Sequence, residues 1–555
     1  MKLSDYITKH ECMAVAVVFA MLAIYHMVFM CFGLDLRDEG FYYTFYQNIF
    51  THPAAVEYNF MYYLTGPIGG MWVKAFPDAG LLGLRVLGLL FMLASTFIAF
   101  RLLRSFIGVT SALLGCAIVS VAAVGNLYAF GNVCATIFFY VVMFRLMLLG
   151  VERNRLWLFL LSGIVAGLNC FVRIPNLLGI GSVAIIALSA HYGMLSWRRA
   201  YGGMVAFVVG VITGVALVSA LQVMLGHEQL FLDNIKALFS NSANSQSDSS
   251  HSFVNLLRVQ AEHYIKVVLP LLALAVLVVV LSRMSNRDSA SSTVKLGCKI
   301  VVVVAVLSFM LYLRPVAIVW CAGFVGAIYV LWNYRNSLSL VAWAGLFMLV
   351  VIPCGSDVYF NLGALVALLS LPLALYAFRR YKTLLAVFVS FLLLFCLVQQ
   401  WQMSYLDRAQ LPSRCVTMKS PLLHGIHTQR YRAEAIDEVL DGISSYVQPG
   451  DTLLVFANAP LLNSLTNTVP ALGASWPGLL DQSVFEQRLL CLPKVPVLVQ
   501  TFLGDKWEPR RYDHLGEDVE KDLNTGNMKL HALDRFLIAR HYKLVYQTEY
   551  FSLYK

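Results

Sequence analysis

The chain has 555 residues, of which 59% are hydrophobic and 13% are charged, and its mean hydropathy is +0.70. Soluble domains are about 45–50% apolar and about 25% charged, so this composition excludes a soluble cytosolic enzyme. The excess of 41 Lys and Arg over 31 Asp and Glu is typical of membrane proteins with basic cytoplasmic loops, and we expect no nucleic-acid partner.

Thirteen apolar runs predict membrane-spanning helices, because about 20 residues cross a bilayer as a helix. The first run is too long for a cleaved signal peptide and no cleavage site follows it, so we expect it to remain as an anchor. The runs lie near 12–33, 81–100, 106–124, 132–150, 156–171, 177–192, 203–225, 264–282, 297–313, 316–333, 338–353, 361–377 and 383–400.

The basic residues predict the orientation of these spans. With the N-terminus in the cytoplasm, the cytoplasmic loops and the N-terminal segment carry 16 Lys or Arg, whereas the short loops on the other side carry only Arg173 and Arg314. This asymmetry follows the positive-inside rule. The long segments 34–80, 226–263 and 401–555 are therefore expected outside, and the functional machinery is expected there too.

The last part of the chain differs from the rest in its patterning. Thr452 to Ala457 and Pro496 to Gln500 are predicted to be buried strands, Ala433 to Tyr446 an amphipathic helix, and Tyr542 to Tyr554 a hairpin. The predicted fold class is therefore an α-helical polytopic membrane protein of about 13 transmembrane helices (1–400), with a C-terminal extracytoplasmic α/β domain (401–555).

An acidic cluster opens the first external loop. Asp35, Asp38 and Glu39 lie within five residues of each other at the end of the first span. Carboxylates beside the apolar zone are costly and tend to be functional or paired, but acids also suit the start of a helix. Tyrosines follow the cluster, notably Tyr42, Tyr43, Tyr62 and Tyr63, and indicate either an interfacial helix or an aromatic cleft suited to a sugar.

These features resemble the GT-C glycosyltransferases, and in particular the branch of protein O-mannosyltransferases and the lipid A aminoarabinose transferase. The resemblance rests on Asp38-Glu39, Tyr42-Tyr43, Gly66-Pro67, Gly83-Leu84-Arg85 and the span Leu161 to Asn176. It covers about 1–400 and extends to the number of spans and the external C-terminal domain. It implies a GT-C-like membrane domain and a polyprenyl-phosphate-linked sugar as donor.

The chain also departs from that family. A Lys-Pro-Pro element is replaced by Tyr63-Leu-Thr-Gly-Pro67, so a ligand for the donor phosphate must come from elsewhere. A second acid near the outer start of the fourth span is replaced by Asn132, which leaves a metal site undecided. A divalent metal ion therefore stays an open question.

Other polar residues are candidates for contacts with the lipid phosphate or the acceptor. Arg173 and Arg314 stand at external turns before Pro; Arg can bind phosphate with its planar fork of donors, or meet lipid headgroups instead. The loop 226–263 has a Ser/Asn-rich middle that is typical of a flap or a linker, and His251, Arg258 and His263 flank it. Gly210-Val-Ile-Thr-Gly214 fits the GxxxG pattern of close helix packing.

The sequence favours an inverting glycosyltransferase in a bacterial inner membrane, acting on the extracytoplasmic face. Asp38 is expected to be the general base, Glu39 to position it or the acceptor, and Asp35 is the reserve candidate. The acceptor is a lipid, a glycan or a protein. The alternatives are a lipid-linked sugar transporter or flippase, and a glycan polymerase or ligase.

Overall fold

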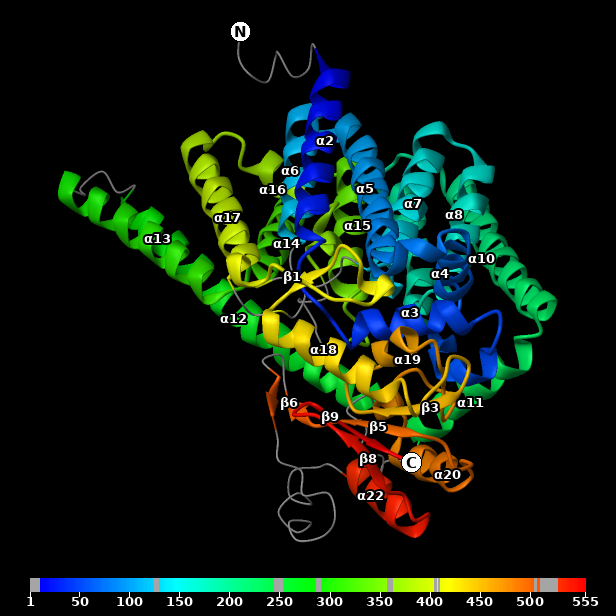
Figure 1. Cartoon of the computed structure of the whole chain (residues 1–555). Coiled ribbons are helices and arrows are strands. Elements are labelled where there is room, and N and C mark those ends of the chain that lie inside the picture. Colours follow the sequence, from blue (N-terminus) through cyan, green and yellow to red (C-terminus); the bar gives the residue numbers. More distant parts are fainter. Residues whose placement is uncertain are drawn as a thin grey trace.

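The computed structural model describes residues 10–123, 129–243, 253–285, 291–356, 363–403, 407, 410–503, 507–509 and 528–555. A bundle of apolar helices forms one part of the molecule, and a smaller part with a β-sheet lies at one end of the bundle (Figure 1). The predicted fold class, a helical polytopic protein with a C-terminal α/β domain, is confirmed.

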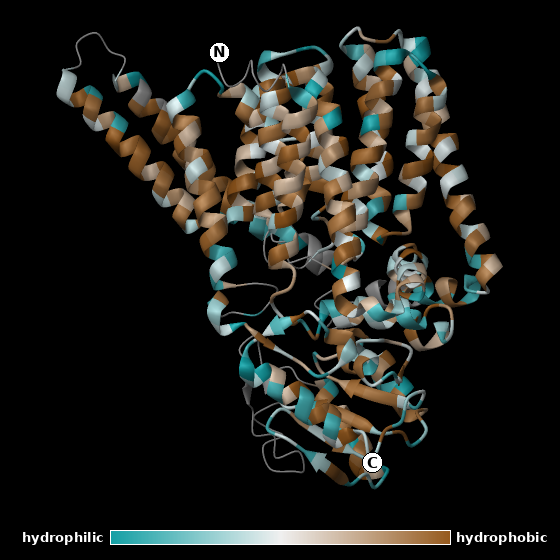
Figure 2. Ribbon diagram, turned by 45° about the horizontal axis from the view of Figure 1, so that its top comes forward, coloured by the Kyte–Doolittle hydropathy of each residue, from teal (hydrophilic) through white to brown (hydrophobic). Residues whose placement is uncertain are grey.

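Each of the thirteen apolar runs coincides with helical structure. The helices are α2 (Glu11–Phe29), α5 (Gly80–Ile107), α6 (Val109–Ala122), α7 (Asn132–Arg153), α8 (Leu156–Cys170), α9 (Ala184–His191), α10 (Trp197–Leu225), α12 (Phe253–Ser285), α13 (Ser292–Tyr312), α14 (Pro315–Asn333), α15 (Ser337–Val351), α16 (Leu371–Ala377) and α17 (Lys382–Gln402). Within the described residues, nine helical segments are long and apolar enough to cross a membrane, and α6, α8 and α15 are shorter apolar helices. Figure 2 shows the apolar character of the bundle.

Two of the predicted spans are irregular rather than single α-helices. The run near 177–192 consists of a 3₁₀ segment, η3 (Ile174–Val183), followed by α9, and the run near 361–377 contains η5 (Ala364–Ala367) before α16. Pro stands in the first turn of both η3 and α16, where its missing N–H is tolerated. Hydropathy detects such segments but does not register the change of helix type.

Glycines allow α8 and α10 to pack closely. A Cβ added to Gly210 would lie 2.1 Å from the carbonyl oxygen of Leu160, and one added to Gly163 would lie 2.0 Å from that of Phe207. Because no side chain fits there, the two backbones lie in direct contact. The predicted close packing at Gly210 and Gly214 is confirmed.

Short helices outside the apolar bundle gather at the end where the sheet lies. They are α3 (Asp38–Asn48), η1 (Pro53–Tyr62), α4 (Thr65–Ala75), η2 (Pro77–Ala79) and α11 (Glu228–Ala243). The described part of the predicted loop 226–263 is helical rather than a flap, since α11 packs on η1 and α12 begins at Phe253. The Ser/Asn-rich residues 244–252, including His251, lie outside the described residues.

The C-terminal part contains a five-stranded sheet of order β4-β3-β5-β9-β8. Strands β4 (Val469–Pro470), β3 (Thr452–Phe456) and β5 (Val497–Gln500) are parallel, whereas β9 (Phe551–Tyr554) pairs antiparallel with both β5 and β8 (Leu544–Gln547). The predicted strands, helix and hairpin are confirmed. The other elements are β1 (Val416–Thr417), β2 (His427–Thr428), β6 (Phe502–Leu503), β7 (Glu508–Pro509), α18 (Arg430–Ile443), α19 (Leu461–Leu465), α20 (Gln482–Leu490), α22 (Met528–Ala539), η6 (Leu411–Ser413), η7 (Pro421–Leu423) and η8 (Pro477–Leu479).

The two faces of the sheet bury their side chains in different cores. Val455 and Leu498 belong to one apolar cluster with Phe45 of α3 and Phe60 of η1, whereas Phe456 and its neighbours pack against α20 and α22. Successive residues of a strand point to opposite faces, which explains this division. The sheet therefore shares a core with the first external segment.

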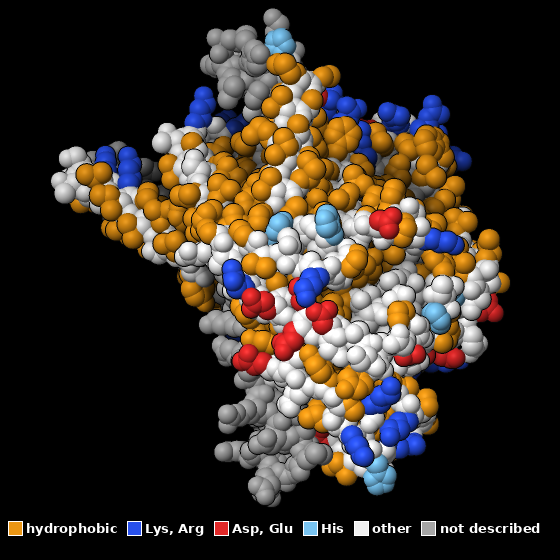
Figure 3. All heavy atoms as spheres, in the orientation of Figure 1, with side chains coloured by type: hydrophobic (Ala, Val, Ile, Leu, Met, Phe, Trp, Pro, Cys, Tyr) orange, Lys and Arg blue, Asp and Glu red, His pale blue; other side chains and the backbone are white. Residues whose placement is uncertain are grey.

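Charges are distributed unevenly between the two ends of the bundle. In the view of Figure 3, the bundle end that carries the N-terminus shows mostly Lys and Arg among its charged residues, whereas acidic and basic residues are mixed near the junction with the sheet. This arrangement agrees with the loop pattern on which the predicted orientation depends.

Candidate active site

The acidic segment lies between the helical bundle and the sheet, and each of its three carboxylates has a different environment. Asp35 is 2% exposed, and its two oxygens accept hydrogen bonds from the backbone N–H groups of Arg37 at 3.0 Å and Glu39 at 3.1 Å. Burial raises the pKa of Asp35, and these N–H groups oppose that shift. Asp35 therefore caps the start of α3, a role that the sequence allowed.

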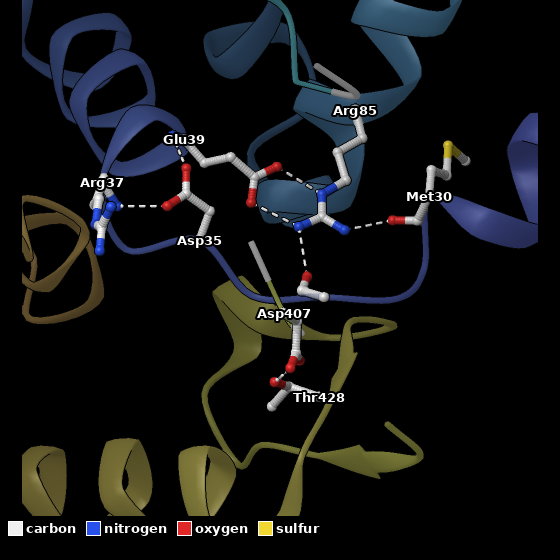
Figure 4. Close-up of polar contacts among 8 residues, drawn as sticks. Met30, Asp35, Arg37, Glu39, Arg85, Asp407 and Thr428 are labelled. Atoms are coloured by element: carbon white, nitrogen blue, oxygen red, sulfur yellow. Dashed lines mark hydrogen bonds and ion pairs between the residues drawn. The ribbon is translucent and has the colours of Figure 1, made fainter. Parts of the chain in front are cut away.

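Glu39 is fully buried and forms an ion pair with Arg85 of α5. Its two oxygens accept from Nε and Nη2 of Arg85, each at 2.6 Å (Figure 4). Arg85 also donates to the carbonyl oxygens of Met30 and Gly33. Burial raises the pKa of Glu39 to about 7, and the guanidinium opposes this shift. The pair ties the acidic segment to the bundle.

Asp38 differs from both neighbours because its side chain is exposed. It stands in the first turn of α3, four residues before Tyr42, so the two side chains share one face of the helix. Burial raises the pKa of the Tyr42 hydroxyl well above its usual range, and Tyr62 and Asp38 add to this effect, while the backbone of Asn132 opposes it by hydrogen bonding. The ring centroids of Tyr42 and Tyr62 are 6.1 Å apart, and a Cβ added to Gly131, the residue before Asn132, would lie 2.8 Å from the Tyr42 ring. Asp38, Tyr42, Tyr62 and Asn132 therefore form one group.

Arg173 extends this group from the turn between α8 and η3. Only 4% exposed, it donates from Nη1 to the carbonyl oxygen of Ile352 and from Nη2 to that of Cys354, both at 2.8 Å. Burial lowers the pKa of the guanidinium, and the nearby hydroxyls of Tyr62 and Tyr42 oppose that shift. Two of its five N–H groups are occupied by these carbonyl oxygens, so the guanidinium is held against the turn that follows α15.

Other predicted site residues are placed differently. Tyr43 is buried in the core, and the Tyr63 hydroxyl is 3.2 Å from Nδ1 of His227. The structure does not bring Arg314 or Arg258 into the Asp38 group: Arg314 is exposed before α14, and Arg258 is 76% exposed and pairs with Glu262 on its own helix at 3.1 Å.

A polar network behind Arg173 was not predicted. The side-chain nitrogen of Asn176 donates to the Thr136 hydroxyl at 2.8 Å and to the Asn169 side-chain oxygen at 3.0 Å, and all three residues are buried. Tyr140 lies over the same network, with its hydroxyl 3.5 Å from the Asn176 carbonyl oxygen. The sequence offered one signal for this network, namely polar residues within apolar runs. The hydrogen bonds of the network fix the turn that carries Arg173.

The residues around Asp38 do not fit a metal site. In the part of the chain that the structure describes, no three His, Cys, Asp or Glu side chains come together as ligands. Asp35 is engaged with backbone N–H groups and Glu39 with Arg85, which leaves Asp38 as the one exposed carboxylate of the cluster. A divalent ion usually needs several oxygen ligands, so no step of the chemistry below passes through a metal.

No protein-family model and no curated protein matches the chain. Among solved structures, it is similar to the Archaeoglobus fulgidus oligosaccharyltransferase with zinc and sulfate, at 11% identity and a TM-score of 0.47, covering 87% of this chain and 68% of that one. The same enzyme tethered to an acceptor peptide gives 11% identity, a TM-score of 0.48 and coverages of 90% and 70%. ArnT from Cupriavidus metallidurans in the apo state gives 13% identity, a TM-score of 0.39 and a coverage of 98% of both chains.

TM-scores below 0.5 carry no conclusion about chemistry, so the function is inferred from this chain's own residues.

Proposed function

We propose that this protein is an integral-membrane glycosyltransferase of the bacterial inner membrane. It transfers a sugar from a polyprenyl-phosphate donor to a lipid, glycan or protein acceptor on the extracytoplasmic face, with inversion. The observation that carries the proposal is the exposed carboxylate of Asp38 at the end of the bundle next to the sheet, one helical turn before the buried Tyr42, whose ring centroid lies 6.1 Å from that of Tyr62. A lipid-linked donor can reach that end from the bilayer.

The chemistry assigns one role to each charged residue. Asp38 accepts the proton of the acceptor hydroxyl as its oxygen attacks the anomeric carbon. The bond from that carbon to the lipid phosphate breaks on the opposite face, and the phosphate leaves with the bonding electrons. Arg173 stabilises the negative charge on the departing phosphate with its guanidinium donors. Tyr42 and Tyr62 supply aromatic faces and hydroxyls for the sugar.

Asp38→Asn tests the role of the base. The substitution keeps the size of the side chain and removes its basicity, so transfer is expected to fall by about 10²–10⁴-fold. Asp35→Asn should reduce transfer less, because its amide oxygen can still accept one of the two backbone hydrogen bonds at the start of α3. Asp78→Asn is the matched control, since Asp78 is also exposed and also stands in the first turn of a helix, η2, in the segment 34–80.

The assay is sugar transfer from a polyprenyl-phosphate donor in proteoliposomes, with the anomeric configuration of the product read by NMR and with thermal stability measured in parallel. Full activity in Asp38→Asn would refute the assignment of the base, and retention of configuration would refute inversion. Movement of the intact donor across the bilayer without transfer would favour the flippase alternative, and elongation of a lipid-linked glycan would favour the polymerase.

A further inference from the structure

The C-terminal domain is joined to the backbone of the acidic segment on both sides of Asp35. His427 of β2 donates its backbone N–H to the Cys31 carbonyl oxygen at 2.7 Å and accepts from the Gly33 N–H at 2.8 Å. Further along, Leu461 of α19 donates to the Leu36 carbonyl oxygen at 3.1 Å. These backbone hydrogen bonds fix the segment that leads into α3, whatever side chains it carries.

Helix α3 itself is held against α19. The buried Thr44 hydroxyl is 2.7 Å from the Ser464 hydroxyl and 3.1 Å from the Pro460 carbonyl oxygen. One turn before Thr44, Gly40 meets the backbone of Leu461 so closely that an added Cβ would lie 2.2 Å from its nitrogen. The lack of a side chain at Gly40 therefore allows the two helices to touch.

A third contact fixes the other side of α3. Ser475 of the C-terminal domain donates its hydroxyl to the Phe41 carbonyl oxygen at 3.3 Å, and the Asn59 side chain donates to the same carbonyl at 3.2 Å. Asn59 and Ser475 also bond each other at 2.9 Å, and both are fully buried. A fully satisfied buried network of this kind makes a contact rigid.

We propose that the C-terminal domain is a positioning element for the proposed active site, and that Thr44, Ser464 and Ser475 are positioning residues for Asp38. This inference rests on the proposed function. Held by Arg85 on one side and by the C-terminal domain on the other, α3 presents Asp38 in a single orientation. A base displaced by about 1 Å loses much of its efficiency, so this rigidity sets the rate of the chemical step.

Hydrogen–deuterium exchange of the intact protein tests the mechanical part of the inference without any activity assay. Thr44→Val removes the hydroxyl that meets α19, and the amides of 38–48 are expected to exchange on the order of tenfold faster. Thr44→Ser keeps the hydroxyl and should restore slow exchange. The control is Thr501→Val, which removes a buried hydroxyl bonded within the C-terminal domain, to the Glu549 carbonyl oxygen.

The inference would be overturned if the amides of 38–48 exchanged no faster in Thr44→Val, or if their exchange rose equally in Thr501→Val. This outcome does not depend on whether the protein transfers sugar. Where transfer is measured, Thr44→Val should lower kcat with little change in KM, and Thr44→Ser should recover it. A disulfide between Thr44→Cys and Ser464→Cys would hold α3 against α19 covalently, so the oxidised double variant should transfer sugar at least as fast as the same variant reduced. If oxidation abolished transfer and reduction restored it, the domain would have to release α3 during the reaction, which would contradict the proposal.

Discussion

The ion pair between Glu39 and Arg85 gives a prediction about stability that is independent of the reaction. Both side chains are fully buried, and the carboxylate accepts two hydrogen bonds of 2.6 Å. Removing one partner of a buried pair costs about 3–5 kcal/mol, because the other charge is left without compensation. Arg85→Met is expected to lose stability in this range, and Arg85→Met with Glu39→Gln is expected to recover part of the loss.

The loss in Arg85→Met should depend on pH. Burial already raises the pKa of Glu39 to about 7, and removing the guanidinium that opposes this shift raises it further. The folded protein then binds a proton that the unfolded chain has lost above pH ~4.3, so stability falls with rising pH until the folded pKa is reached. In the natural protein the loss of stability with rising pH ends near pH 7. In Arg85→Met it continues above pH 7, at about 1.4 kcal/mol per pH unit. The gap between them should therefore widen from pH 7 to pH 9.

Thermal unfolding in detergent at a series of pH values measures this gap. The double variant should lack the widening, since Gln does not titrate. Arg104→Met is the matched control, because Arg104 pairs with Glu11 in a partly exposed position where an ion pair contributes only about 0–1 kcal/mol. A gap that is constant from pH 7 to pH 9, or an Arg85→Met as stable as Arg104→Met, would refute the reasoning.

Three further predictions follow from the site and the orientation. Arg173→Ala should raise the KM for the polyprenyl-phosphate donor in the transfer assay, whereas the exposed Arg314→Ala should leave it nearly unchanged; equal effects would contradict the role given to Arg173. Burial lowers the pKa of His227, so stability should fall as the pH drops below the unfolded value of ~6.5, and thermal unfolding of His227→Phe at pH 5 and 7.5 should lack this component. An impermeant maleimide applied outside spheroplasts should label the exposed Cys415, and a cysteine placed in 283–299 should stay unlabelled; the reverse pattern would invert the proposed topology.

Local patterns predicted most of the fold. Continuous apolar runs marked every helix of the bundle, and alternation and turn signals marked β3, β5 and the hairpin of β8 and β9, because these features depend on a few adjacent residues. The capping role of Asp35 is of the same kind, since its partners lie two and four residues away.

Contacts between distant parts of the chain could not be predicted in this way. Glu39 and Arg85 are 46 residues apart, and nothing in either local sequence identifies the other as its partner. The sequence predicted that Glu39 positions the base or the acceptor, and it did not predict the buried ion pair that Glu39 forms with Arg85. The same limit applies to Arg173, since the carbonyl oxygens that hold its guanidinium belong to the turn after α15, about 180 residues further along the chain.

The contacts between Thr44 and α19 also have a consequence for the synthesis of the protein. Their partners are separated by 416 and 420 residues, so the ribosome completes the whole membrane bundle before the second half of this contact emerges. Until α19 has been made, the Thr44 hydroxyl has neither of these two partners. Domains form as units during translation, but this site belongs to two of them. If the proposed function holds, a chain truncated before α19 is therefore expected to insert into the membrane but to transfer no sugar.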